Sequence, residues 1–151
     1  MTTTPTKAPA TTPTRAKPSL ATEQLAALRA HGLAQIAQGQ AQAAAASLKL
    51  VCRADPNDAV AHKVYGTAAA RIGRHRDAFV ALTRAAELTP NDIEIHCVLA
   101  ELAIGMVQYK AAFAHLQTCL KLDPKSAHPH GIRARMLVRK LQRALEEAVK
   151  H

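Results

Sequence analysis

The histidines are the side chains of this sequence with the broadest chemical capacity. The chain of 151 residues contains eight, and His62, His96 and His130 follow one another at intervals of 34 residues. Imidazole can bind zinc or transfer protons near neutral pH. If each interval is one stacked helical unit, the equivalent positions lie about 10 Å apart. Zinc holds its nitrogen ligands at roughly 2.0–2.1 Å. We therefore expect these histidines to pack between helices and not to share a metal.

The cysteines and the remaining motifs point to no catalytic site. Cys52, Cys97 and Cys119 are odd in number and form no C-x-x-C pair, so they predict reduced, buried, apolar residues and not a disulfide framework or a zinc ribbon. His128 and His130 have no acidic or cysteine neighbour in the sequence. Glycine-rich nucleotide loops and Ser/His/Asp or Cys/His arrangements are missing as well. The sequence predicts a protein that is not an enzyme and uses no cofactor or metal.

The same junction between two helices occurs three times, as DPNDAVAHKVYG at 55–66, TPNDIEIHCVLA at 89–100 and DPKSAHPHGIRA at 123–134. Proline cannot continue the incoming helix. The Asp or Ser two residues later is a preferred N-cap for the next one. These stop-and-cap pairs are Pro56 with Asp58, Pro90 with Asp92, and Pro124 with Ser126.

A second helix is expected inside each unit, at about 40–53, 74–88 and 108–122. Gly39 and Gly73, also 34 residues apart, mark the turns that precede the first two of them. In the third unit Val107 occupies the glycine position, and the nearest glycine, Gly105, comes two residues early. Paired helices with a period of 34 residues predict an all-α solenoid.

Residues of the same size class recur at equivalent positions of the three units, and in this pattern the chain resembles tetratricopeptide repeats. Departures from that family's pattern are His62 and His96 in place of its tryptophan and Ala69 and Ala103 in place of its tyrosine. The resemblance implies three repeats within 21–126, at about 25–58, 59–92 and 93–126. The matching columns are Gly32, Gly66 and Ala100; Ala44, Ala78 and Ala112; Leu48, Leu82 and Leu116; and Val51, Ala85 and Cys119.

The two ends differ from the repeats. Residues 1–20 hold four of the eight prolines and no acid, which predicts a disordered, basic Thr/Pro-rich tail; a targeting or export signal is the alternative. Residues 127–151 predict one capping helix, because solenoids need a polar-backed helix over the last repeat. Its apolar stripe is Leu137, Leu141, Leu145 and Val149. Self-association through this stripe, as a homodimer, is a further hypothesis.

The formal net charge of +9 is concentrated at the two ends of the chain. A basic accessory protein that contacts nucleic acid or an anionic surface through its tail and last helix is therefore an alternative function. Nucleic acid is disfavoured because the chain has only two Phe, two Tyr and no Trp to stack on bases. No apolar run is long enough to span a membrane, and no secretory signal is evident. These features favour the cytoplasm.

The favoured function is the binding of a protein client, because stacked helix pairs form a concave surface lined by their first helices. In the register of the family, that surface mixes apolar, basic and acidic residues. It suits an extended or helical client segment. The predicted groove residues are Arg29, Leu33, Ile36, Val60, Lys63, Thr67, Arg71, Glu94, Cys97, Glu101, Ile104 and Arg135.

Two known binding modes of the family can be compared with the sequence. The clamp that co-chaperones use for the C-terminal carboxylates of Hsp70 and Hsp90 maps onto Arg29, Leu33, Val64, Glu94 and Val98, where Glu94 would repel a carboxylate. That mode is disfavoured. In overall plan the chain is similar to the small repeat chaperones of type III secretion, which hold translocator or export subunits. The resemblance implies a chaperone or scaffold, although many of those chaperones are acidic.

Overall fold

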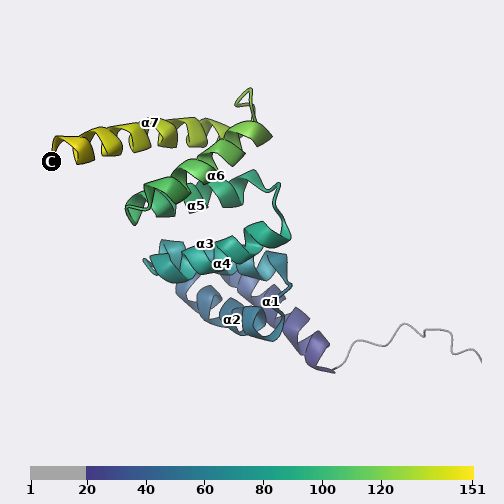
Figure 1. Ribbon diagram of the computed structural model, residues 1–151. Helices are drawn as coiled ribbons and strands as arrows, with labels where there is room; N and C mark the ends of the chain where they lie inside the picture. Colours follow the sequence, from purple (N-terminus) through teal and green to yellow (C-terminus); the bar gives the residue numbers. More distant parts are fainter. Residues whose placement is uncertain (1–19) are drawn as a thin grey trace, which may run out of the picture.

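The computed structural model describes residues 20–151, which form seven α-helices and no strand (Figure 1). The all-α prediction is confirmed. The predicted tail falls outside the described residues except for Leu20, which begins the first helix. The helices are α1 (Leu20–Ala37), α2 (Ala41–Ala54), α3 (Ala59–Arg71), α4 (His75–Leu88), α5 (Ile93–Gly105), α6 (Tyr109–Leu122) and α7 (Pro129–Lys150).

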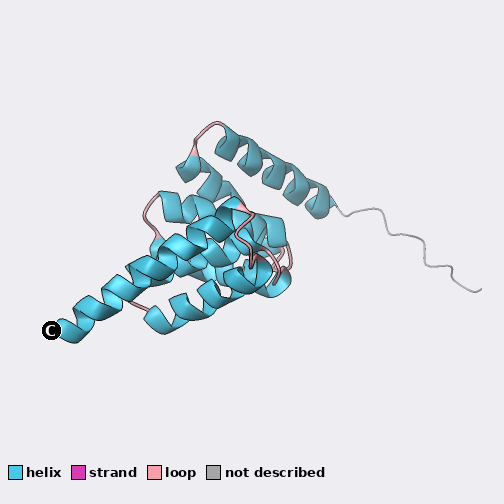
Figure 2. Cartoon of the chain, turned by 90° about the horizontal axis from the view of Figure 1, so that it is seen from above, coloured by secondary structure: helices cyan, strands magenta, loops and turns pink. Residues whose placement is uncertain are grey.

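The first six helices form three antiparallel pairs stacked on one another, and α7 lies over the last pair (Figures 1 and 2). The helices α2, α4 and α6 each begin one residue or less from the position predicted by the 34-residue period. The α4–α5 junction is packed more loosely than the α2–α3 junction. This seam between the second and third pairs matters for the functional site.

Close contact within each pair depends on the small-residue column. A Cβ atom at Gly66 would lie 2.5 Å from Leu82 Cγ, and one at Gly32 would lie 2.7 Å from Leu48 Cγ. Both leucines are fully buried. The glycines therefore let the first helix of each pair approach the leucine of the second, while the third pair accommodates Ala100 at the same column.

The N-cap prediction is confirmed for two junctions and wrong for the third. Asp58 accepts a hydrogen bond from the Ala61 N–H at 3.0 Å, and Asp92 accepts one from the Glu94 N–H at 3.0 Å. Ser126 does not cap α7. The N-cap is His128, in extended backbone two residues later, because the residue before a proline is disfavoured in helical conformation and Pro129 follows.

A side-chain carboxylate organises this displaced third junction. Asp123 accepts hydrogen bonds from the backbone N–H groups of Ala127, at 3.0 Å, and His128, at 2.8 Å. These bonds lower the pKa of Asp123, the His128 bond most. A Cβ at Gly131 would lie 1.9 Å from Asp123 Oδ2, so the first turn of α7 packs directly on the carboxylate. The junction turns the chain through Asp123 instead of through Ser126.

The three turns inside the pairs share one backbone conformation. Gly39 and Gly73 have φ of 76° and 82°, and Val107 has φ of 61° at the equivalent position. In each turn, the next residue's N–H bonds to a carbonyl five residues earlier: Gln40 to Gln35, Arg74 to Ala69 and Gln108 to Ala103. A β-branched side chain is strained at positive φ. The third pair therefore keeps the turn at an energetic cost that the first two pairs avoid.

We expect Val107→Gly to stabilise the protein by about 1 kcal/mol, because glycine adopts positive φ without the Cβ clash. The Val107 side chain is exposed, so its loss removes little packing. Gly73→Ala is the reciprocal change and should destabilise by a similar amount. Urea denaturation followed by circular dichroism measures both. If Val107→Gly instead destabilises the protein, the packing of the valine side chain contributes more free energy than its strained backbone costs.

The buried side chains form two cores that meet at α5. The first core joins α2, α3 and α4 to the Ile95 and Leu99 side of α5. The second joins the Cys97 and Ala100 side of α5 to α6 and α7. The predicted cap is therefore present, but its apolar stripe is only half covered: Leu137 and Leu141 are buried, whereas Leu145 is 43% and Val149 is 87% exposed. The end of α7 extends past the helices beneath it (Figure 1).

The predicted packing role of the recurring histidines is confirmed for His62 and His96. Both are buried. His62 Nδ1 donates to the Asp58 carbonyl at 2.9 Å, and His96 Nε2 donates to the Pro90 carbonyl at 2.7 Å, because a carbonyl can only accept. His130 differs, since it stacks on His128 with ring centroids 5.3 Å apart and borders the concave face.

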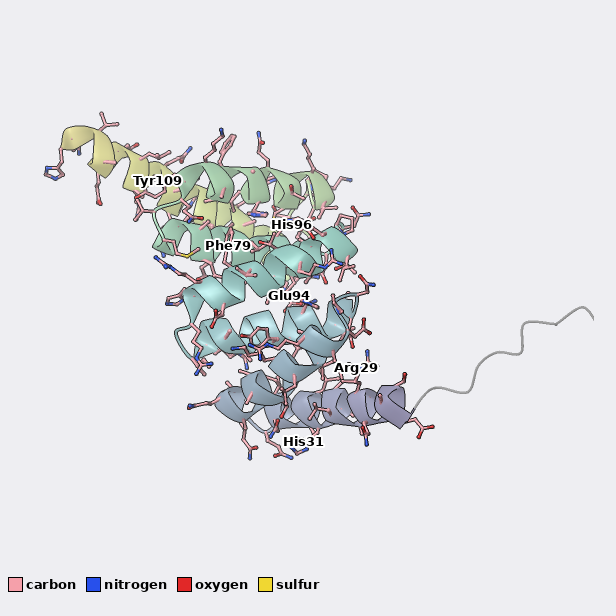
Figure 3. The ribbon with its side chains drawn as sticks, turned by 60° about the horizontal axis from the view of Figure 1, so that its bottom comes forward. Arg29, His31, Phe79, Glu94, His96 and Tyr109 are labelled. Atoms are coloured by element: carbon pink, nitrogen blue, oxygen red, sulfur yellow. The ribbon has the colours of Figure 1, made fainter. Side chains whose placement is uncertain are left out.

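The buried His96 pairs with the half-buried His115 of α6. Their Nδ1 atoms lie 3.2 Å apart, within hydrogen-bond distance. Phe79 of α4 completes the cluster, with its ring edge-on to His115. Phe79 and His96 are labelled in Figure 3. Burial, and then the proximity of His96, lower the pKa of His115. The folded state therefore holds His115 in its neutral form.

This pair predicts a loss of stability in mild acid. The pKa of His115 is lower in the folded state than its ordinary 6.5. The neutral His115 side chain therefore makes its full contribution to the free energy of unfolding above pH 6.5, and this contribution declines as the pH falls below that value. The lowered pKa values of Asp92 and Asp123 act in a separate window, below about pH 4. Urea denaturation at pH 7.5 and 5.5 should show this decline, and His115→Gln should flatten it. An unchanged slope in the variant would contradict the assignment.

Candidate functional site: the concave groove

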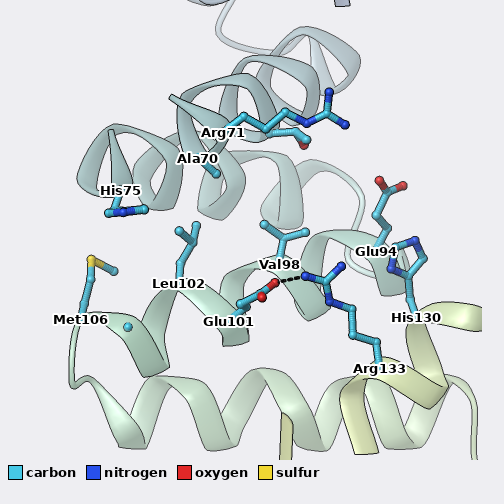
Figure 4. A pocket seen from close by; sticks show the side chains of 12 residues that line it. Ala70, Arg71, His75, Glu94, Val98, Glu101, Leu102, Met106, His130 and Arg133 are labelled. Atoms are coloured by element: carbon cyan, nitrogen blue, oxygen red, sulfur yellow. Dashed lines mark hydrogen bonds and ion pairs between the residues drawn. The ribbon is translucent and has the colours of Figure 1, made fainter. Parts of the chain in front are cut away.

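A pocket of about 530 Å³ opens on the concave face where α3, α5 and α7 converge (Figure 4). It lies at the loosely packed seam between the second and third pairs. Its apolar floor consists of Ala70 from α3 with Val98, Leu102 and Met106 from α5 and its end. The rim is polar and carries both charges: Thr67, Arg71, His75, Glu94, Glu101, His130 and Arg133.

A second pocket, of about 720 Å³, continues this surface along α7. Glu101 and Arg133 line both pockets and form an ion pair between α5 and α7 (Figure 4). The remaining lining of the second pocket comes entirely from α7: Met136, Leu137, Arg139, Lys140, Arg143, Ala144 and Glu147. We call the two pockets together the concave groove.

Four of the twelve predicted groove residues line this groove, namely Thr67, Arg71, Glu94 and Glu101. Leu33 and Val60 are exposed but lie outside both pockets. Ile36 is half-buried and packs against the first core. Of the predicted groove residues, the two pockets therefore bring together members from α3 and α5 and none from the N-terminal pair.

The prediction was wrong for Cys97, Ile104 and Arg135. Cys97 is 0% and Ile104 is 7% exposed, because α7 packs on the face of α5 that the family register places in the groove. Arg135 turns toward the segment between α6 and α7, where its guanidinium donates to the Pro124 carbonyl at 2.8 Å. Arg133, two residues earlier, is the arginine of α7 that faces α5.

Two of the three basic residues predicted on α1 and α3, Arg29 and Lys63, are held by ion pairs to the next repeat. Arg29 Nη1 lies 3.3 Å from Asp58, and Lys63 Nζ lies 2.8 Å from Asp92, both at a separation of 29 residues. Each pair ties a first helix to the N-cap of the following first helix. The equivalent third pair would be Cys97 with Ser126, and neither can carry this charge. Arg29 and Lys63 therefore link consecutive repeats through ion pairs.

Lys63 also contacts Glu94 at 2.7 Å, which neutralises one acid of the groove rim. Burial alone would lower the pKa of Lys63, but its hydrogen bonds to Asp92 and Glu94 outweigh burial and raise it. Burial opposes the ionised form of Asp92, and the Lys63 bond outweighs it and lowers the pKa of Asp92. Both groups remain charged at neutral pH, so the ion pair is maintained there.

The cysteines contribute no nucleophile to the groove. Burial raises the pKa of Cys52 and of Cys119 to about 12, and it also raises that of Cys97. All three are free thiols, and at neutral pH they stay protonated. A thiol reacts as its thiolate, so the arrangement is that of packing residues.

Sequence reasoning missed His75, Val98, Leu102, Met106, His130 and the α7 lining. His75 lies in the run Arg74-His75-Arg76, which reads as a solvated turn. A register built from single repeats also cannot show that the second and third pairs separate at the seam. The basic run of α7 was visible in the sequence, but its orientation depends on how Pro129 and Asp123 set the start of the helix.

Comparison with known proteins supports the fold. Residues 93–126 match the tetratricopeptide repeat family. No curated protein sequence matches the chain. None of the helices in residues 20–151 has the length and apolar character that a membrane span requires.

Several solved structures share the fold at low sequence identity. The translocator chaperone SycD of Yersinia enterocolitica is 15% identical, with a TM-score of 0.73 over 82% of this chain and 87% of that chain. PcrH in complex with the chaperone-binding region of PopD is 20% identical, with a TM-score of 0.66 over 83% and 94%. The first repeat domain of Spaghetti (RPAP3), bound to an HSP90 peptide, is 18% identical, with a TM-score of 0.70 over 82% and 94%.

Proposed function

We propose that this chain, whose described residues have a tetratricopeptide-repeat fold, is a non-enzymatic protein that holds a segment of a client protein in its concave groove. The observation that carries the proposal is the pocket at the seam, with an apolar floor and a polar rim contributed by four helices, α3, α4, α5 and α7. An apolar side chain of a client can enter the floor while rim groups bind the client backbone.

Within this function, we propose a type III secretion chaperone as the class. The support is architectural: SycD and PcrH, both similar in fold to this chain, were solved with a YopD peptide and with the chaperone-binding region of PopD. The carboxylate clamp is the less suitable mode, because Glu94 stands at one of its positions and is occupied by Lys63. A cytoplasmic location follows from the chaperone proposal.

Selection of phage-displayed random peptides on the purified full chain tests this function. We expect binders, and we expect Val98→Gln to weaken them because a polar amide replaces part of the apolar floor. Val80→Gln is the matched control, since Val80 is 70% exposed on α4 and lies outside both pockets. Circular dichroism checks that both variants fold. Failure to select any binder, or equal loss in both variants, would contradict the proposal.

A further inference from the structure

Most of the cations of the concave groove that lack an acidic partner lie on α7. Among residues 20–151, Arg29 and Lys63 on α1 and α3 are paired with Asp58 and Asp92, and Arg133 is paired with Glu101. By contrast, four lining bases have no ion pair within the described part of the chain: Arg71, Arg139, Lys140 and Arg143.

The acids of the groove do not balance these bases. The two pockets are lined by Glu94, Glu101 and Glu147. Glu94 and Glu101 are already held by Lys63 and Arg133. Only Glu147 is left to offset the four bases, and it lies near the end of α7. The second pocket therefore presents a cationic surface.

We infer that the α7 half of the groove binds an acidic stretch of the client, directly beside an apolar side chain of the same segment that enters the α3–α5 pocket. This inference rests on the proposed function and specifies its client chemistry. The two pockets share Glu101 and Arg133, so one continuous extended segment can occupy both. Complementary charge increases both the association rate and the specificity of such a contact.

Other occupants fit the groove less well. No Phe, Tyr or Trp side chain of the described residues lines either pocket, so bases of a single-stranded nucleic acid would lack the usual stacking partners. The chain's own N-terminal residues carry Lys7, Arg15 and Lys17 without an acid, and α7 would repel them. The site also differs in place from the carboxylate clamp, which maps onto α1, α3 and α5 and not onto α7.

The test uses full-length protein and the peptides from the selection described above, measured by fluorescence anisotropy. We expect the selected peptides to be enriched in Asp and Glu next to Leu, Ile or Met. Arg139→Glu/Lys140→Glu/Arg143→Glu should weaken them by about tenfold or more, and raised salt should weaken binding to the wild type. The control, Lys110→Glu/Lys121→Glu/Lys125→Glu, changes the net charge equally at exposed residues outside both pockets and should change affinity little.

The outcomes separate this inference from the proposed function. Selected peptides without acidic enrichment, bound equally by wild type and the α7 variant, would overturn the inference and leave client binding intact. Equal weakening by both triple variants would also overturn it, since bulk charge would then account for the effect. If a labelled oligothymidylate binds the wild type more tightly than the acidic peptides do, the inference is overturned, because the preferred ligand of the groove is then a nucleic acid and not a protein segment. No selected peptide at all would overturn both proposals.

Discussion

Leu82→Ala is expected to lower the free energy of unfolding by about 2–5 kcal/mol, the range for large-to-small changes in a packed core. Leu82 is fully buried and fills the space opposite Gly66. Urea denaturation followed by far-ultraviolet circular dichroism measures the loss. Val80→Ala, two residues away on the exposed face of α4, should change stability by less than about 0.5 kcal/mol. A small effect of Leu82→Ala would show that the pair does not rely on this contact.

The same contact predicts a dependence between two substitutions. Gly66→Ala alone should destabilise by about 1–3 kcal/mol, because the new Cβ would lie 2.5 Å from Leu82 Cγ and 3.2 Å from the Ala78 carbonyl oxygen. In the Leu82→Ala background the first of these clashes disappears, so Gly66→Ala should cost clearly less there. Additive effects of the two changes would contradict direct contact.

Removal of α7, by ending the chain after His128, is the second change for which we expect a large effect on stability. It would expose Cys97, Ala100 and Ile104 of α5, which α7 now covers. The burial of the Leu137 and Leu141 side chains alone contributes about 3–6 kcal/mol to the free energy of unfolding. We expect the shortened chain to lose cooperative thermal unfolding and to aggregate.

The control for this truncation ends the chain after Ala144. It removes Leu145 and Val149, which are largely exposed, and should leave the unfolding transition nearly unchanged. Thermal unfolding by circular dichroism and sedimentation velocity compare both chains. A stable, monomeric protein without α7 would show that the third pair needs no cap.

The sequence was sufficient for the repeats because their signals are local. A proline with an Asp two residues later stops one helix and starts the next, and the glycine at Gly39 and Gly73 predicts the turns. Even where the residue type departs from the pattern, the fold holds: Val107 adopts the turn conformation of the glycines. Repetition therefore lets the turns at Gly39 and Gly73 predict the third turn, at Val107, where the sequence signal is weaker.

The groove was predicted less completely because it depends on distances between repeats. The family register places Cys97 and Ile104 on the inner face, but α7 covers that face. The displaced N-cap at His128 sets the start of α7, and through it the position of Arg133 against Glu101. The seam between α4 and α5 is likewise a property of packing and not of a motif. Such features require three-dimensional contacts among segments far apart in the sequence.

The most direct test of the account is site-specific photo-cross-linking of a selected peptide. Benzoylphenylalanine is introduced either at Arg71, on the rim of the concave groove, or at Phe113, an exposed side chain of α6 outside both pockets. The account predicts a peptide adduct, detected by mass spectrometry, from position 71 and none from position 113. An adduct from position 113 without one from position 71 would contradict the assignment of the concave groove as the client-binding site.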